Sequence, residues 1–206
     1  MSNLHDRRGE LHDKIGLRFK GHVLIRDAVT KEVLVDKFNA VHFENMSECL
    51  ALGLANRPNG HIHQMVFGNG ASTVSAVGTI NYFPPNVVGQ DAQLYNQTYA
   101  KVVDDMSAMN PSPDLNKLRV QHTLGTVYSD VIVTCTLDLN EPSGQDAFDD
   151  APNNDGSYVF DELGLKAFDP TGAGDGKLLS HVIFHPVQKS LNRSIEVIYT
   201  IRIILT

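Results

Sequence analysis

Residues 127–139 read VYSDVIVTCTLDL, and the order of apolar and polar side chains in this stretch decides the fold class. Every second position is apolar, and mostly polar residues stand between: Val131, Val133, Cys135, Leu137 and Leu139. This period of two indicates a β-strand with one buried face, because successive side chains of a strand point to opposite faces of the sheet. We therefore expect a sheet that packs one face against a core.

Similar segments on both sides of this stretch predict an antiparallel, β-sandwich-like fold. Strand-forming segments follow one another in pairs around short polar or glycine-containing turns. The expected pairs are residues 17–26 with 32–35, 118–124 with 127–139, and 158–166 with 177–185. Residues 61–67 predict a further strand. Residues 194–205 predict a last strand that is central or covered on both sides, because Ile198 and Ile204 lie opposite its main apolar row.

One segment near the N-terminus has the period of a helix instead. Residues that share a helical face recur within residues 44–56, namely Met46, Cys49, Leu50, Gly53 and Leu54. Residues 57–60 (RPNG) end this helix, because proline cannot continue it and Asn-Gly favours a turn. The expected fold is mainly β, with one short helix and long loops.

The chain of 206 residues is long enough for one well-cored domain with an inserted loop region. Residues 1–16 are polar and predict an N-terminal arm, which is either flexible or lies on a partner. Residues 17–206 then form a single β-rich domain. The insertion covers about residues 71–113, where prolines and glycines surround one apolar segment, residues 94–103. Irregular spans of this length often contact a partner.

Composition argues against several classes of function. The formal charge is −7, from 17 Lys plus Arg against 24 Asp plus Glu, and there is no basic cluster, so we predict no nucleic-acid binding. No apolar run approaches the roughly 18 residues that cross a bilayer, so we predict no membrane span. Residues 1–14 lack the apolar core of a signal peptide. Cys49 and Cys135 lie in apolar patterns and are expected to be buried, reduced thiols.

The motifs of common enzyme classes are missing from the sequence. There is no G-x-S-x-G elbow, and neither cysteine has a histidine beside it in a catalytic pattern. Gly68-Asn69-Gly70 lacks the Lys-Ser/Thr of a phosphate-binding loop, so we interpret it as a turn. We predict a non-enzymatic protein without a cofactor.

The best metal candidates are His61 and His63. On a strand both imidazoles point the same way, and three copies around a threefold axis could complete an octahedral site. No carboxylate or cysteine lies beside them at a recognisable ligand spacing, so we interpret them as surface or interface histidines and predict no metal. His181 and His185 are weaker candidates still. The acidic loop residues have a composition that suits Ca²⁺ but no matching motif, so we expect solvated loops at Asp149, Asp150, Asp155, Asp169 and Asp175.

The order of segments in the second part of the chain resembles a known family. The segments are, in order, MVFGNG (65–70), residues 94–105, residues 131–142, FDELGL (160–165), GKLL (176–179), KS (189–190) and residues 195–203. This order is similar to that of the N-terminal attachment domain of the phage tail-collar fibre family. The resemblance covers roughly residues 60–206, and its most specific part is the Glu-Leu-Gly-Leu box at residues 162–165.

The resemblance implies a structural protein of a tailed-bacteriophage virion, assembled in the host cytoplasm. Its partners would be other virion proteins and copies of itself in a ring, trimer or lattice. It implies structural or packing roles for Glu162, Leu163, Gly164, Leu165, Gly68 and Gly70. We expect a component of the tail, baseplate or collar. Two alternatives remain open: a capsid decoration or cement protein on the head lattice, and a metal-dependent binding protein or enzyme.

Overall fold

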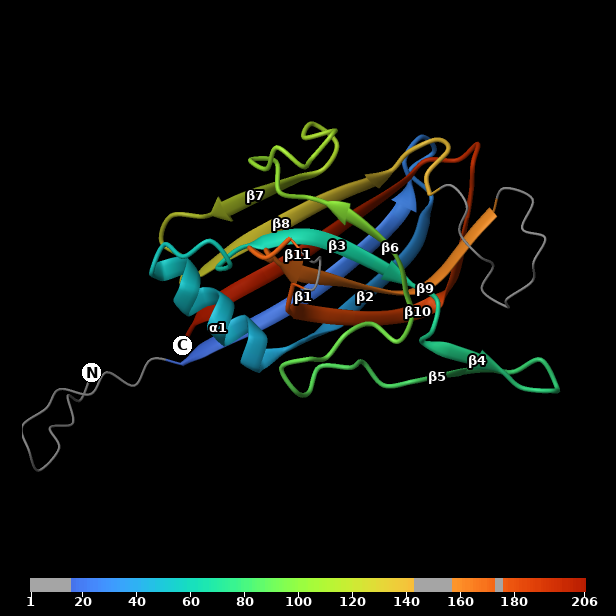
Figure 1. Cartoon of the computed structure of the whole chain (residues 1–206), viewed down its shortest axis with the longest axis horizontal. Coiled ribbons are helices and arrows are strands. Elements are labelled where there is room, and N and C mark those ends of the chain that lie inside the picture. Colours follow the sequence, from blue (N-terminus) through green and yellow to red (C-terminus); the bar gives the residue numbers. More distant parts are fainter. Residues whose placement is uncertain (1–15, 143–156, 173–175) are drawn as a thin grey trace, which may run out of the picture.

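The computed structural model describes residues 16–142, 157–172 and 176–206 (Figure 1). Its main element is a nine-stranded antiparallel sheet with the order β6-β3-β9-β10-β2-β1-β11-β8-β7. Its strands are β1 (Leu17–Asp27), β2 (Val33–Val41), β3 (Ile62–Gly68), β6 (Gln97–Val102), β7 (Lys117–His122), β8 (Tyr128–Leu137), β9 (Ser157–Ala167), β10 (Leu178–Ser190) and β11 (Ile195–Leu205). β4 (Ser72–Val74) and β5 (Ile80–Tyr82) form a separate hairpin. The mainly β, antiparallel, sandwich-like fold predicted from the sequence is confirmed.

The sheet curls, so that its two halves face each other (Figure 1). β2 joins the halves, because residues 33–39 pair with β1 and residues 40–41 pair with β10. One core cluster contains buried side chains of both halves, among them Val23, Cys135, Tyr199, Phe67 and Leu163. Near the open side, Lys101 Nζ of β6 donates a hydrogen bond to the carbonyl oxygen of Thr136 in β8 at 2.7 Å. The two ends of the sheet are thereby tied together.

The last strand has the central position that its sequence predicted, since β11 lies between β1 and β8. Its inward row is buried: Ile195, Val197, Tyr199 and Ile201. Ile198 and Ile204, on the opposite face, are partly exposed. The three strand pairs predicted from the sequence are also present, as β1 with β2, β7 with β8, and β9 with β10.

The helix predicted for residues 44–56 is α1 (Phe43–Leu54). It begins at His42, whose Nδ1 accepts a hydrogen bond from the backbone N–H of Asn45 at 3.1 Å, which satisfies one of the unpaired N–H groups of the first turn. Met46 and Cys49 are buried, whereas Leu54 is 91% exposed. The predicted apolar face is therefore wrong at its C-terminal end, because only the first two turns of the helix lie against the core.

Residues 83–96 cross the outer face of the half-sheet formed by β3, β9 and β10; we call this segment the cover loop. Leu94 of the loop packs in a small buried cluster with Val66 of β3 and Leu178 of β10. This half-sheet is therefore buried on both faces, by the core on one side and by the cover loop on the other.

The inserted region 71–113 contains more regular structure than expected, since it holds the β4–β5 hairpin as well as β6. Residues 1–15 of the predicted arm and residues 143–156 of the predicted acidic loop lie outside the described residues. Gly16, the last residue of that arm, already exchanges backbone hydrogen bonds with Thr206. Within the described residues, no helix is both long and apolar enough to cross a membrane.

Candidate functional site

Glu162 of β9 is a carboxylate with no exposed surface. Its Oε1 accepts hydrogen bonds from the backbone N–H groups of Asn96 at 2.8 Å and Gly70 at 3.2 Å. Its Oε2 accepts from the backbone N–H of Tyr95 at 3.0 Å and from Nε2 of His181 at 2.9 Å. A carboxylate offers about four acceptor positions, so these donors use all of them. The group joins three separate segments of the chain and has no capacity left for a substrate.

The charge of Glu162 is stabilised by these donors. Burial acts to raise its pKa, but the hydrogen bonds from His181 and from the backbone N–H groups of Asn96 and Tyr95 prevail, and the pKa lies below its usual value. Nδ1 of His181 accepts the backbone N–H of Asn86 at 2.8 Å. We therefore assign the hydrogen of this imidazole to Nε2, from which it is donated to Glu162. The cover loop is thus held at Asn86 as well as at Tyr95 and Asn96.

Asp161, the preceding residue of β9, holds the chain just beyond β3. Its Oδ1 accepts the backbone N–H of Ala71 at 3.2 Å, and its Oδ2 accepts the hydroxyl of Ser72 at 2.6 Å. Burial raises the pKa of Asp161 by more than these two bonds lower it. Asp161 and Glu162, adjacent residues of β9, thus both hold the chain that follows β3.

The residues to which the sequence assigned packing roles lie together around Glu162. β3 pairs with β9 in a register that sets Gly68 opposite Glu162 and Phe67 opposite Leu163. Side chains alternate along β9: Leu163 and Leu165 belong to the core, whereas Glu162 lies under the cover loop. The residues brought together in this way are Glu162, Leu163, Gly164, Leu165, Gly68 and Gly70.

All three of these glycines stand where a side chain has no room; a Cβ at Gly70 would lie 2.7 Å from the backbone nitrogen of Asn96. A Cβ at Gly164 would lie 2.5 Å from the carbonyl oxygen of Ser180 and 2.7 Å from Cδ1 of Leu178. A Cβ at Gly68 would lie 2.4 Å from the carbonyl oxygen of Asn96. The contacts with the oxygens of Ser180 and Asn96 involve backbone atoms of a paired strand and of the cover loop, which cannot move aside without disturbing their hydrogen bonds. Close approach of the backbone therefore explains glycine at these positions.

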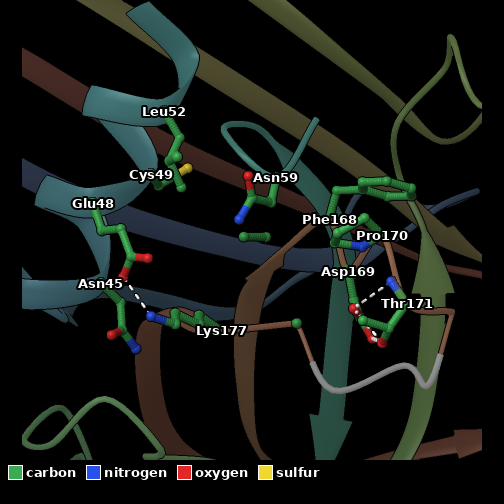
Figure 2. A pocket seen from close by; sticks show the side chains of 12 residues that line it. Asn45, Glu48, Cys49, Leu52, Asn59, Phe168, Asp169, Pro170, Thr171 and Lys177 are labelled. Atoms are coloured by element: carbon green, nitrogen blue, oxygen red, sulfur yellow. Dashed lines mark hydrogen bonds and ion pairs between the residues drawn. The ribbon is translucent and has the colours of Figure 1, made fainter. Parts of the chain in front are cut away.

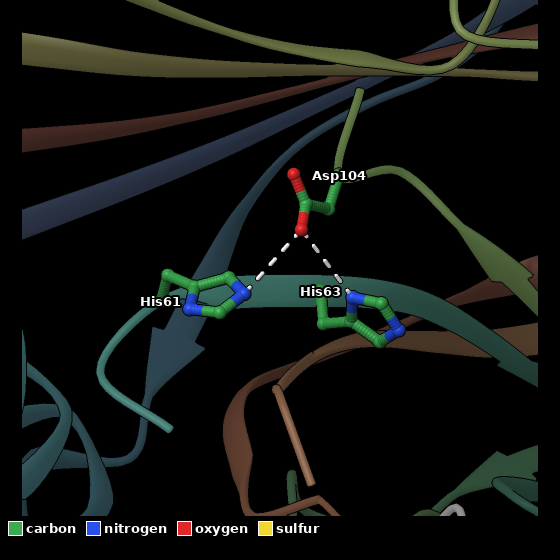
Figure 3. A group of neighbouring side chains, drawn as sticks. All are labelled: His61, His63 and Asp104. Carbon is green, nitrogen blue, oxygen red and sulfur yellow. Dashed lines mark ion pairs between the residues drawn. The ribbon is translucent and has the colours of Figure 1, made fainter. Parts of the chain in front are cut away.

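A second group of polar residues lies at the start of β3, at the opposite end of this strand from Gly68 and Glu162. Oδ2 of Asp104 is 3.4 Å from Nε2 of His61 and 3.6 Å from Nδ1 of His63 (Figure 3). The three ligand atoms all lie within 4.8 Å of one another. The spacing along the sequence gave no sign of Asp104, because it is the pairing of β6 with β3 that brings this carboxylate to the histidines.

Phe168 and the backbone of Met106 contact the side chains of this group. His63 is 4% exposed, and burial lowers its pKa against the opposing effect of Asp104. The ring of Phe168 stacks on His61 at a centroid distance of 5.3 Å and meets His63 edge-on at 4.9 Å. Oδ1 of Asp104 accepts the backbone N–H of Met106 at 3.0 Å, so Oδ2 is the oxygen that faces the imidazoles.

A cavity of about 270 Å³ lies between α1 and the chain that follows β9 (Figure 2). Its volume is just below the about 300–1,000 Å³ of typical small-molecule sites. Lys177 pairs with Glu48 at its wall, and the N–H and hydroxyl of Thr171 bond to Oδ1 of Asp169 at 2.8 and 2.7 Å. Burial raises the pKa of the Cys49 thiol to about 11, so the thiol is protonated at neutral pH. Cys49, the one cysteine among the described residues that line the cavity, is therefore not an activated nucleophile.

The other candidates from the sequence have simple positions. Cys49 and Cys135 are both buried and neither is in a disulfide, and burial raises the pKa of Cys135 to about 12. Nδ1 of His185 lies 3.0 Å from the hydroxyl of Tyr82. Asp149, Asp150, Asp155 and Asp175 lie outside the described residues. Sequence reasoning missed the roles of His181, Asp161 and Asp104, whose partners are all distant along the chain.

Comparisons with known proteins found no relative of this chain. No protein-family model matches the sequence, and no curated protein or solved structure matches the chain.

Gly164 offers a first test of the packing. We expect Gly164→Val to lower the free energy of unfolding by about 3 kcal/mol or more, since overpacking alone typically costs about 1–3 kcal/mol and backbone pairing is disturbed here as well. His63→Ala should cost less, because it leaves the pairing of β3 with β9 intact. Urea unfolding of both variants in buffer with EDTA measures the difference, and equal losses would contradict this account of Gly164.

Glu162 offers a second test, with a defined pH dependence. Glu162→Gln should destabilise the protein at pH 7 by about 2–4 kcal/mol, because the amide loses charge-assisted bonds and places an NH₂ group against a donor. The folded-state pKa of Glu162 is lowered, so its ionisation contributes stability above the unfolded pKa of about 4.3, and this contribution is lost as the pH falls. The difference between wild type and variant should narrow below about pH 4. A difference that is constant from pH 7 to pH 3 would refute the role of the charge.

Proposed function

We propose that this chain is a non-enzymatic structural protein of a tailed-bacteriophage virion, present in many copies in the tail, baseplate or collar. It is assembled in the host cytoplasm and docks to neighbouring virion subunits, including copies of itself. The order of segments from residue 65 to residue 203 supports the assignment to a phage. The arrangement of side chains supports a role in assembly, as follows.

The observation that carries the assembly role is an exposed aromatic surface beside β2. Phe38 and Phe43 are 74% and 70% exposed. Together with Phe19 and Val87 they border an open groove of about 500 Å³. Contiguous exposed apolar surface of this kind is typical of protein interaction sites, since covering it removes apolar area from water. A rigid sheet that carries such a surface suits a subunit that docks.

The environments of Glu162, Cys49 and Cys135 support a non-catalytic role for these three residues. The acceptor positions of Glu162 are all used by backbone N–H groups and His181. Both cysteines are buried with raised pKa values. Neither arrangement supplies a general base or nucleophile that a substrate could reach. These groups hold the fold, which is the purpose expected of polar groups in a building block.

The location in the virion tests the proposal. We expect antibody raised against this chain to label the tail, baseplate or collar of purified virions in electron microscopy. Label over the head shell would instead favour the capsid decoration alternative. A chain that is missing from purified virions, while it is abundant in infected cells, would overturn the proposal as a whole.

The aromatic surface gives a separate prediction. We expect Phe38→Ser combined with Phe43→Ser to reduce incorporation of the chain into virions by at least about tenfold, because truncating large aromatic residues at an interface commonly costs over 1–2 kcal/mol. Stability of the isolated chain should change by no more than about 0.5 kcal/mol per site, as for other exposed positions. Val29→Ser is the matched control, since Val29 is 82% exposed in the β1–β2 turn. Normal incorporation of the double variant would remove this surface from the account.

A further inference from the structure

The group at the start of β3 combines three donors that suit a metal ion. His61 and His63 supply imidazole nitrogens, and Asp104 supplies a carboxylate oxygen that faces both (Figure 3). Two imidazoles with one carboxylate form a donor set that binds Zn²⁺ and similar divalent transition metals in proteins. The set comes from two neighbouring strands, because Asp104 follows β6 and the histidines belong to β3 or immediately precede it.

The distances favour a shared ion over a direct hydrogen bond. The separations of 3.4 and 3.6 Å between Asp104 Oδ2 and the two ring nitrogens exceed the usual range for a hydrogen bond, about 2.7–3.2 Å. A tetrahedral ion with bonds of about 2.0–2.1 Å holds its ligand atoms about 3.3–3.4 Å apart. The two separations from Asp104 therefore lie close to the edges of a tetrahedral coordination shell, and the two imidazole nitrogens lie within 4.8 Å of each other.

Burial of His63 adds to the distance argument, because the nearest acceptor to its Nδ1, Oδ2 of Asp104, is 3.6 Å away. The residue is 4% exposed, and its Nδ1, the atom that faces Asp104, has no hydrogen-bond partner. A buried polar atom without a partner costs about 1–3 kcal/mol, so folded proteins rarely leave one. A metal ion on Nδ1 would satisfy it. The backbone N–H of Met106 holds the other carboxylate oxygen, which orients Oδ2 as outer-sphere partners of metal ligands do.

We propose that His61, His63 and Asp104 bind one divalent transition-metal ion, with Zn²⁺ as the best-fitting ion. The ion joins the start of β3 to the chain that leaves β6, an outer strand of the sheet. Three protein ligands leave at least one coordination position for water or for a donor group of a neighbouring molecule. The side chain of His61 is 42% exposed, so the group is reachable from solvent.

Metal titration of the full chain tests the proposal. After treatment with EDTA, the tag-free protein is titrated with Zn²⁺ in a calorimeter and with Co²⁺ while visible absorption is recorded. We expect one ion per chain at this site, the strong absorption of tetrahedral Co²⁺, and a higher melting temperature with Zn²⁺. Mg²⁺ should have no effect, because it prefers oxygen ligands.

Matched variants decide whether this group is the site, since the chain has nine histidines. Asp104→Asn and His63→Gln should weaken Zn²⁺ binding at least about tenfold, given that loss of an outer-sphere partner alone costs about 10–100-fold. His22→Gln should leave it unchanged, because His22 pairs with Asp36 at 2.6 Å as an exposed histidine–carboxylate pair elsewhere. Melting of the metal-free variants shows that they fold. Equal affinity in Asp104→Asn and His22→Gln, or no binding by the wild type, would overturn the proposal.

Discussion

A carboxylate that is buried on folding loses several kcal/mol of solvation free energy. Hydrogen-bond donors held in fixed positions by the protein must compensate for this loss. Glu162 imposes this condition on the half-sheet of β3, β9 and β10. Its four donors belong to the turn after β3, to the cover loop and to β10, segments that are distant in the sequence. The position of each segment depends on the others, because a missing donor would leave a buried charge short of partners. This mutual dependence makes the region rigid.

The Glu-Leu-Gly-Leu box of β9 serves both faces of this half-sheet. Leu163 and Leu165 enter the core, while Glu162 and Gly164 on the other face receive the cover loop. Residues 83–96 of the inserted region are thereby held against the half-sheet. The buried carboxylates form hydrogen bonds within the protein, whereas apolar side chains such as Phe38 and Phe43 are exposed. This arrangement is compatible with the docking role proposed above, which needs a fixed shape and a surface that partners can cover.

The sequence predicts the fold well where the signal is local. Alternating side chains located the strands and their pairs, and a helical period located α1, although Leu54 is exposed because the helix extends past the core. The β4–β5 hairpin was missed, since its strands are short and lie among prolines and glycines. The sites depend on contacts between distant segments. No spacing along the chain indicates that His181 meets Glu162 or that Asp104 meets His61, because register between β3, β6, β9 and β10 creates both groups.

Amide hydrogen exchange, followed by NMR, tests the central claim about Glu162 most directly. The account predicts that the amides of Gly70, Tyr95 and Asn96, although they lie in loops, exchange as slowly as those of Leu163 and Leu165 in the middle of the sheet. Exchange of the three loop amides at the fast rates of exposed turns, with the sheet still protected, would show that the buried carboxylate does not hold these segments.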